Sequence, residues 1–91
     1  MRDLDGTVAV VTGAGTGIGR AISHALVESG ARVHMWGRRL EVLRDAARGL
    51  DADRVCLTGC DVSDRAQVRE ASSSALEHWD GVDLLVNNAG I

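Results

Sequence analysis

The sequence contains no proline, phenylalanine, tyrosine or lysine, and Trp36 and Trp79 are its only large aromatic residues. Without proline, a proline-rich linker is excluded. With 45% hydrophobic residues and almost no aromatics, a core must be built from Ala, Val, Leu and Ile. That mixture suits buried strands covered by helices.

Strong charge of one sign and long apolar runs are also missing. The net charge of −3 is mild, and no stretch of like charges forms the basic face of a nucleic-acid binder, so we do not expect nucleic acid as a partner. No apolar run approaches the roughly eighteen residues of a membrane span. The first five residues, Met1 to Asp5, carry three charged side chains and do not form the apolar core of a signal peptide. We therefore expect a cytoplasmic protein with no membrane partner.

Cysteine is scarce, and the two thiols, Cys56 and Cys60, share one face of a predicted strand. A zinc site needs two more ligands nearby, and the three histidines are scattered at positions 24, 34 and 78. A disulfide is not expected in the cytosol. Both cysteines are best interpreted as small buried hydrophobic residues.

Continuous apolar and β-branched runs alternate with helical patterns along the whole chain. Such runs are typical of strands buried on both faces. In the first helical segment Ile18, Ala21, Ile22, Ala25 and Leu26 form one apolar stripe, and Gly30 ends it. The strands are predicted over residues 7–12, 32–36, 55–60 and 82–86.

The second and third helical patterns are marked by apolar residues at helical spacing. Ser63 is predicted to cap the third helix, with Asp64 in its first turn. The second pattern comprises Leu40, Leu43, Ala47 and Leu50, and the third comprises Val68, Ala71, Ala75, Leu76 and Trp79. The order β-α-β-α-β-α-β predicts an α/β fold with a parallel sheet and helices on both faces. We expect the first half of a Rossmann-type doubly wound sheet, with strand order 3-2-1-4, spanning residues 1–91.

A glycine-rich turn joins the first strand to the first helix, from Gly13 to Gly19. Backbone N–H groups and the positive end of the dipole at a helix N-terminus bind a pyrophosphate well. A side chain at Gly13 or Gly17 would block that approach, and Gly19 lets the helix lie close to the sheet. The alternative is a purely structural turn with no ligand.

Three motifs in order resemble the short-chain dehydrogenase/reductase family. Thr12 to Gly19 matches T-G-x-x-x-G-x-G, Asp61-Val62 matches the D-V pair that borders the adenine pocket, and residues 87–90 match N-N-A-G. The resemblance covers nearly the whole chain and implies a nicotinamide dinucleotide as cofactor.

The resemblance also implies roles for individual residues. The glycine turn would wrap the phosphates and the adjacent ribose, while Asp61 would bond the adenine amino group and Val62 would pack on the ring. Asn88 and the two residues after it would line the riboses, and Asn87 would tie the fourth strand to its neighbours. Asp61 could instead only cap the following loop. The candidate cofactor-binding residues are Gly13, Gly15, Thr16, Gly17, Ile18, Gly19, Arg38, Asp61, Val62, Asn88, Ala89 and Gly90.

The end of the second predicted strand bears on which nicotinamide cofactor is bound. NAD-binding domains usually carry a carboxylate there for the ribose 2′-hydroxyl. This chain has Arg38 and Arg39 instead, and a guanidinium pairs well with the 2′-phosphate of NADP. Thr16 departs from relatives with a second basic residue in the turn, and a solvated arginine pair is the alternative. NADP is therefore favoured over NAD.

The family's catalytic Tyr and Lys have no counterpart, because this sequence contains neither. Ser72, Ser73 and Ser74 fall on a helix surface, so no residue here is predicted to be catalytic. We expect this chain to be the N-terminal, cofactor-binding part of an NAD(P)-dependent oxidoreductase. The remainder would lie in the same or a separate chain.

The resemblance further implies a small carbonyl or alcohol substrate and a homo-oligomer. The alternatives are a non-catalytic half domain that binds a nucleotide or a partner protein, and a sugar-nucleotide epimerase. Turnover of a ketone with NADPH distinguishes the enzyme from the half domain.

Overall fold

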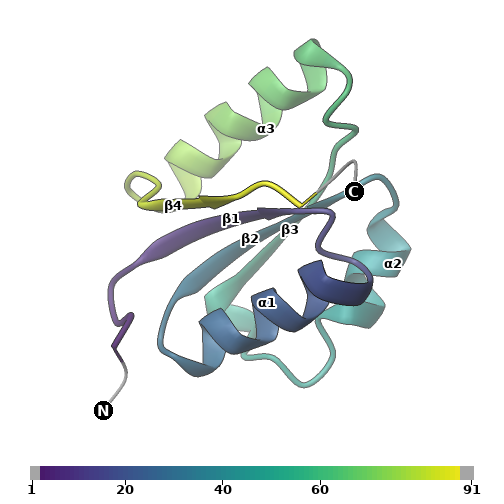
Figure 1. Cartoon of the computed structure of the whole chain (residues 1–91). Coiled ribbons are helices and arrows are strands. Elements are labelled where there is room, and N and C mark those ends of the chain that lie inside the picture. Colours follow the sequence, from purple (N-terminus) through teal and green to yellow (C-terminus); the bar gives the residue numbers. More distant parts are fainter. Residues whose placement is uncertain (1–2, 89–91) are drawn as a thin grey trace.

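Four parallel strands form the centre of the computed structural model, which describes residues 3–88 (Figure 1). Their order in the sheet is β3-β2-β1-β4, so the predicted topology is confirmed. Val10 of β1 lies opposite His34 of β2, and His34 lies opposite Cys56 of β3. The strands are β1 (Val8–Thr12), β2 (Arg32–Gly37), β3 (Val55–Gly59) and β4 (Leu84–Val86).

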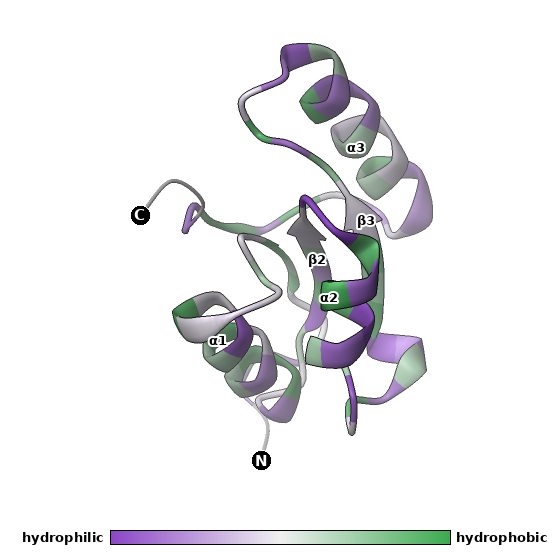
Figure 2. Cartoon of the chain, turned by 90° about the vertical axis from the view of Figure 1, so that its right-hand side faces the viewer, coloured by the Kyte–Doolittle hydropathy of each residue, from purple (hydrophilic) through white to green (hydrophobic). Residues whose placement is uncertain are grey.

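Helices cover both faces of this sheet. Helices α1 and α2 lie on one face and α3 lies on the other, as Figures 1 and 2 show. The helices are α1 (Gly17–Glu28), α2 (Leu40–Ala46) and α3 (Arg65–His78), with a short 3-10 helix, η1 (Ala52–Arg54), before β3. In the described part of the chain, no helix combines the length and the apolar character needed to cross a bilayer.

The alternation of side chains along β1 and β2 divides the core in two. Ala9, Val11, Val33 and Met35 face α1 and α2 and are fully buried. The intervening residues face α3, where Val10 and Trp36 pack with Cys60, Ala71 and Ala75. Strands that feed two cores must be apolar at every position, which explains the continuous runs in the sequence.

The buried face of α1 agrees only in part with the predicted apolar stripe, of which Ile22 and Leu26 pack on the core. Ile18 is 65% exposed, whereas Gly19, Ser23 and Val27 are buried. Small residues face the sheet because α1 lies close to it, and the Ser23 hydroxyl donates to the Gly19 carbonyl at 2.8 Å. The buried hydroxyl is thus satisfied inside the helix, so a polar residue occupies a core position that hydropathy alone does not indicate.

Several element ends also differ from the prediction. Helix α2 ends at Ala46, although Leu50 still packs on the core from the turn that follows. Asp64, not Ser63, caps α3, because its carboxylate accepts hydrogen bonds from the N–H groups of Ala66 and Gln67. Strand β4 begins two residues later than expected, at Leu84.

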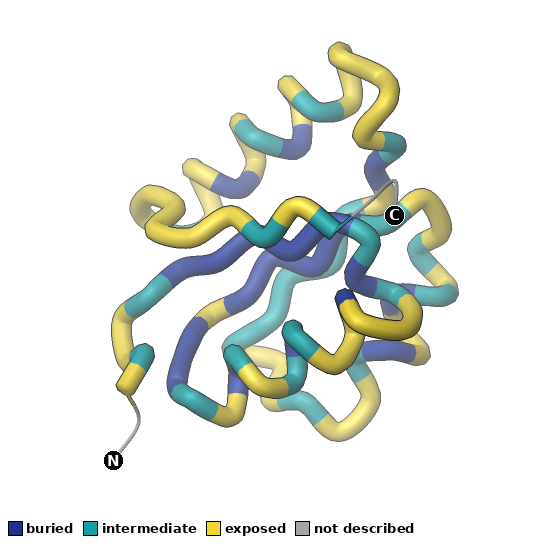
Figure 3. The backbone as a smooth tube through the Cα atoms, in the orientation of Figure 1, coloured by how far each residue is buried: buried dark blue, intermediate teal, exposed yellow. Residues whose placement is uncertain are grey.

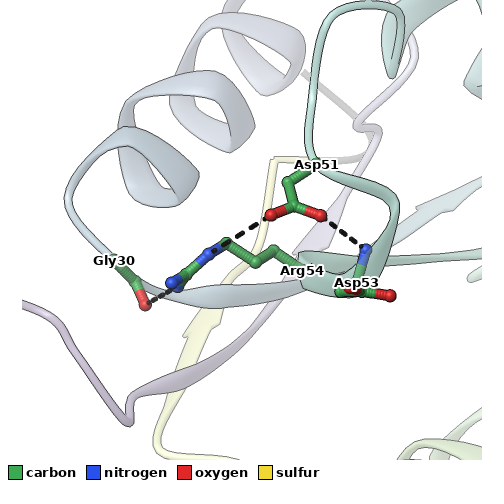
Figure 4. Close-up of polar contacts among 4 residues, drawn as sticks. All are labelled: Gly30, Asp51, Asp53 and Arg54. Carbon is green, nitrogen blue, oxygen red and sulfur yellow. Dashed lines mark hydrogen bonds and ion pairs between the residues drawn. The ribbon is translucent and has the colours of Figure 1, made fainter.

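Arg54 fastens η1 to the end of α1 (Figure 4). Its guanidinium donates from Nη1 to the Gly30 carbonyl at 2.7 Å, and its Nε lies 3.9 Å from Oδ2 of Asp51. The Asp51 carboxylate also accepts from the Asp53 N–H at 2.9 Å and thereby caps η1. A single side chain therefore holds together the end of α1 and the segment that leads into β3.

The start of β1 is joined to the residue just before β4. Oδ2 of Asp83 accepts the Val8 N–H at 2.9 Å, and the Val8 carbonyl accepts the Asp83 N–H at 2.8 Å. Strand β4 pairs with β1 over three residues, but Leu85 remains 62% exposed. Figure 3 shows exposed residues along the approach to β4 and over much of α3, in contrast to the mostly buried residues of β1 and β2.

Candidate cofactor site

A cleft of about 660 Å³ opens where β1, β2 and β3 end. In an open parallel sheet, ligands bind at the carboxyl ends of the strands, near the point where the strand order reverses. Here β1 is that point, because β2 and β4 lie on either side of it. The lining residues are Gly13, Gly15, Thr16, Gly37, Arg38, Arg39, Val42, Leu43, Cys60, Asp61, Val62 and Ser63.

The glycine turn forms one wall of this cleft. Gly13 and Gly17 have φ values of +61° and +53°, which side chains disfavour. A Cβ atom at Gly19 would overlap the Gly13 carbonyl oxygen and would lie 2.8 Å from Nδ2 of Asn88. Gly19 is therefore required by close packing and Gly17 by its backbone conformation.

The turn is held against its neighbours on two sides. The Ala14 N–H donates to the Trp36 carbonyl at 3.0 Å, which fixes the turn beside the end of β2. A Cβ atom at Gly15 would lie 2.7 Å from Cγ1 of Val42, so a side chain at this position would require Val42 of α2 to shift. The wall of the cleft is thus bare backbone at Gly13 and Gly15.

The N-terminus of α1 differs from that of α3. Thr16 is its N-cap residue, but the Thr16 side chain makes no capping hydrogen bond, and no acidic residue lies in the first turn. Asp64 satisfies the corresponding N–H groups of α3. The first N–H groups of a helix have no acceptor within the helix. Among residues 3–88, therefore, α1 has no side chain that competes with an anion at its N-terminus.

Arg38 and Asp61 follow the adjacent ends of β2 and β3. The Cys60 N–H donates to the Gly37 carbonyl at 2.7 Å, which continues the β2–β3 pairing up to these two residues. Oδ1 of Asp61 accepts from the Ser63 N–H at 3.0 Å and from the Ser63 hydroxyl at 2.7 Å. These hydrogen bonds, aided by the positive charge of Arg38, lower the pKa of the Asp61 carboxyl. Asp61 does brace the following loop, while it also lines the cleft.

Asn87 and Asn88 reach the glycine turn from β4. The Asn88 N–H donates to Oγ1 of Thr12 at 2.9 Å, and Nδ2 of Asn88 donates to the Gly13 carbonyl at 3.3 Å. The Thr12 hydroxyl lies 3.3 Å from Oδ1 of Asn87. These contacts tie the end of β4 to β1, as expected for Asn87, and hold the start of the turn at Gly13.

The structure thus brings most of the predicted residues to one place. Gly13, Gly15, Thr16, Arg38, Asp61 and Val62 line the cleft, while Gly17, Ile18, Gly19 and Asn88 belong to the turn or its support. Ala89 and Gly90 lie outside the described residues.

The sequence model of the short chain dehydrogenase family matches residues 7–91. The chain belongs to this family. An uncharacterised oxidoreductase of Staphylococcus aureus (strain USA300) is 42% identical over 90 residues, which are 99% of this chain and 39% of that protein. The chain therefore spans about two-fifths of the length of this curated relative.

Solved structures of short-chain dehydrogenases have the same fold. A 3-ketoacyl-(acyl-carrier-protein) reductase from Brucella melitensis, complexed with NADH, superposes with a TM-score of 0.91 at 36% identity, over 98% of this chain and 36% of that one. The N-domain of a bacterial malonyl-CoA reductase, with NADP, superposes with a TM-score of 0.89 at 36% identity, over 97% of this chain and 17% of that one. Solved relatives with this fold thus hold NADH in one case and NADP in another.

The residues present fit such a cofactor in this short-chain dehydrogenase chain. The cleft is lined by bare backbone at Gly13 and Gly15, the N-cap side chain of α1 makes no capping hydrogen bond, and Arg38 supplies positive charge. Among residues 3–88, by contrast, no three His, Cys, Asp or Glu side chains are grouped as metal ligands. Cys60 is buried and Cys56 is half-buried, and both are free thiols.

The sequence analysis missed several residues of the cleft. Val42 and Leu43 form its apolar floor, yet only Leu43 lies on the predicted stripe of α2. Cys60 is placed in the wall by its bond to Gly37, and its position directly before Asp61 at a strand end was the available signal. Helical spacing predicts which residues face the core, whereas Val42 lies off that stripe and its side chain lies close to Gly15 of the turn.

Proposed function

We propose that this chain is the cofactor-binding part of an NAD(P)-dependent oxidoreductase that interconverts a small carbonyl compound and its alcohol, with NADP preferred. The observation that carries the proposal is the uncapped N-terminus of α1, which opens on a cleft with bare glycine on one side and Arg38 on another. An anionic dinucleotide matches both the N–H donors and the positive charge.

Each part of the cleft suits one part of the dinucleotide. The turn from Gly13 to Gly19 would hold the pyrophosphate against the N–H groups of α1. The apolar floor and Val62 would pack on the adenine ring, and Asp61 would accept a hydrogen bond from its amino group. Asn88 would support the ribose side, together with Ala89 and Gly90 outside the described residues.

Arg38 is the basis of the proposed preference for NADP. No carboxylate follows Gly37, where a ribose 2′-hydroxyl would otherwise be bound, and Arg38 and Arg39 both line the cleft. A guanidinium donates two parallel hydrogen bonds to a phosphate, which a hydroxyl cannot match.

The bound nicotinamide supplies the hydride chemistry. The described residues bind the cofactor, and the substrate contacts are proposed to come from the rest of the protein. Self-association and a cytoplasmic location remain predictions from the sequence.

Binding of NADPH and NADH to the protein that contains this sequence tests the proposal. We expect tighter binding of NADPH, and we expect Arg38→Ala to weaken it about tenfold or more while NADH affinity changes less than about twofold. Arg69→Ala, on the exposed surface of α3, is the matched control and should change neither. Equal affinities in the wild type, or an unchanged NADPH affinity in Arg38→Ala, would contradict the NADP preference.

Turnover distinguishes this function from that of a non-catalytic nucleotide-binding module. NADPH consumption with a generic ketone supports the oxidoreductase. Tight binding without turnover of any carbonyl or alcohol substrate supports the binding module.

A further inference from the structure

Hydrogen bonds hold both the backbone and the side chain of Asp61. Its N–H donates to Oε1 of Gln67 at 2.9 Å, and its carbonyl accepts the Asp64 N–H at 3.0 Å. Its Oδ1 accepts from the Ser63 N–H at 3.0 Å and from the Ser63 hydroxyl at 2.7 Å. No group among residues 3–88 donates a hydrogen bond to the other carboxylate oxygen, Oδ2. An unbonded acceptor thus belongs to a fixed residue that lines the cleft.

The backbone on either side of Asp61 is anchored to different elements. The Cys60 N–H donates to the Gly37 carbonyl at 2.7 Å, which ties the chain just before Asp61 to the end of β2. On the other side, Nε2 of Gln67 donates to Oδ2 of Asp64 at 3.2 Å, and Asp64 caps α3. Because both the sheet and α3 hold the backbone, rotation of the Asp61 side chain is the freedom that Ser63 restricts.

The chemistry of the free oxygen selects a donor. The hydrogen bonds from Ser63 lower the pKa of the Asp61 carboxyl, so the side chain is ionised at neutral pH and can only accept hydrogen bonds. The 6-amino group of adenine is such a donor. A carboxylate that rotates freely must be ordered when a ligand binds, and this ordering reduces the affinity. Ser63 orders the carboxylate before any ligand arrives.

We propose that Ser63 is a positioning residue that determines the specificity of the cleft for adenine, because it fixes the Asp61 carboxylate with Oδ2 left to accept the 6-amino group. This inference rests on the proposed function, in which Asp61 binds that group. Since Ser63 acts through Asp61, loss of its hydroxyl should weaken the contact with the amino group and leave the rest of the cofactor site unchanged.

Titration of the protein that contains this sequence with NADPH and with its purine analogue tests the inference. The analogue carries hydrogen in place of the 6-amino group and is otherwise identical, so the ratio of Kd(analogue) to Kd(NADPH) reports the contact with that group. For a hydrogen bond to a charged, half-buried acceptor we expect a ratio of about ten in the wild type. Ser63→Ala keeps the backbone N–H bond to Oδ1 and should lower the ratio about two- to fivefold.

Further variants separate this role from a general effect on the structure. Ser63→Thr keeps the hydroxyl and should hold the ratio within about twofold of the wild type. Ser74→Ala, which removes an exposed hydroxyl of α3 outside the cleft, is the matched control and should leave the ratio unchanged. In an Asp61→Ala background, Ser63→Ala should no longer affect the ratio, because no carboxylate remains to be positioned.

An unchanged ratio in Ser63→Ala overturns the inference, and so does an equal fall in Ser63→Thr or Ser74→Ala. An effect of Ser63→Ala that persists in the Asp61→Ala background also overturns it, since Ser63 would then act independently of Asp61. Equal affinities of the wild type for NADPH and the analogue overturn the inference but leave the binding of NADPH intact. Failure of the wild type to bind NADPH overturns the proposed function as well.

Discussion

At the scale of single residues, the glycines of the turn meet different physical requirements. Gly17 has a backbone conformation that side chains disfavour, but open space surrounds its missing Cβ. Gly19 lies in an ordinary helical conformation, but the Gly13 carbonyl and Asn88 leave no space beside it. A substitution at Gly17 therefore tests the backbone conformation, and a substitution at Gly19 tests the packing.

Gly19→Ala is expected to lower the free energy of unfolding by at least about 2 kcal/mol, because the new methyl group must displace backbone. Gly59 is the matched control, since nothing lies within 4 Å of its missing Cβ. Urea unfolding of both variants is the measurement. A Gly19→Ala variant as stable as Gly59→Ala would show that the turn can move away from α1.

At the scale of elements, the sequence predicted the strands better than the helix faces. The strands β1 and β2 were found because Val10 and Val11 face different cores and must both be apolar. The face of α1 was predicted only in part: Ile22 and Leu26 do pack on the core, but Gly19 and Ser23 are also buried there for their small size, which hydropathy does not register. The short helix η1 was missed because it rests on polar contacts between Asp51, Asp53 and Arg54.

The residues of the candidate site also divide into those that the sequence predicts and those that depend on packing. Its glycines, Arg38 and Asp61 could be identified from spacing and residue type. The contact of Val42 with the turn could not, because it depends on how closely α2 approaches Gly15.

The contact between Arg54 and the end of α1 gives a prediction at this scale. Arg54→Ala should lower the free energy of unfolding by about 1–2 kcal/mol, because the Gly30 carbonyl loses a charged hydrogen-bond donor. Arg48→Ala removes only an ion pair with Asp45 whose side chains are 80% and 67% exposed, and should cost about 0.5 kcal/mol or less. Chemical denaturation compares the two. Equal effects would mean that the Gly30 bond adds nothing beyond surface charge.

At the scale of the whole molecule, His34 links stability to pH. This side chain is 1% exposed, and it lies against Trp79 with ring centroids 4.6 Å apart. Burial, with a smaller contribution from the charge of His78, lowers the pKa of His34 from 6.5 to about 4. The unfolded chain therefore binds a proton at a pH where the folded chain does not.

Because the folded pKa is the lower one, the stabilisation is complete above pH 6.5 and is lost as the pH falls toward 4. The loss from His34 between pH 8 and pH 5 should be about 2 kcal/mol. In His34→Leu the free energy of unfolding should fall less between pH 8 and pH 5 than in the wild type, whatever the stability of the variant at pH 8. Urea unfolding at the two pH values measures this, and an unchanged pH dependence in the variant would exclude His34 as its source.

The pairing of β1 with β4 has a consequence for the order of events during protein synthesis. Val8 and Asp83 exchange hydrogen bonds across 75 positions of sequence. Strands β1 to β3 can come together while the chain is still leaving the ribosome, but one edge of β1 stays open until Asp83 and β4 emerge. Closing so long a loop is slow, and an open apolar edge attracts other chains in the meantime. Asp83 and β4 thus protect the first strand, and delays in translating them are expected to expose the nascent chain to aggregation.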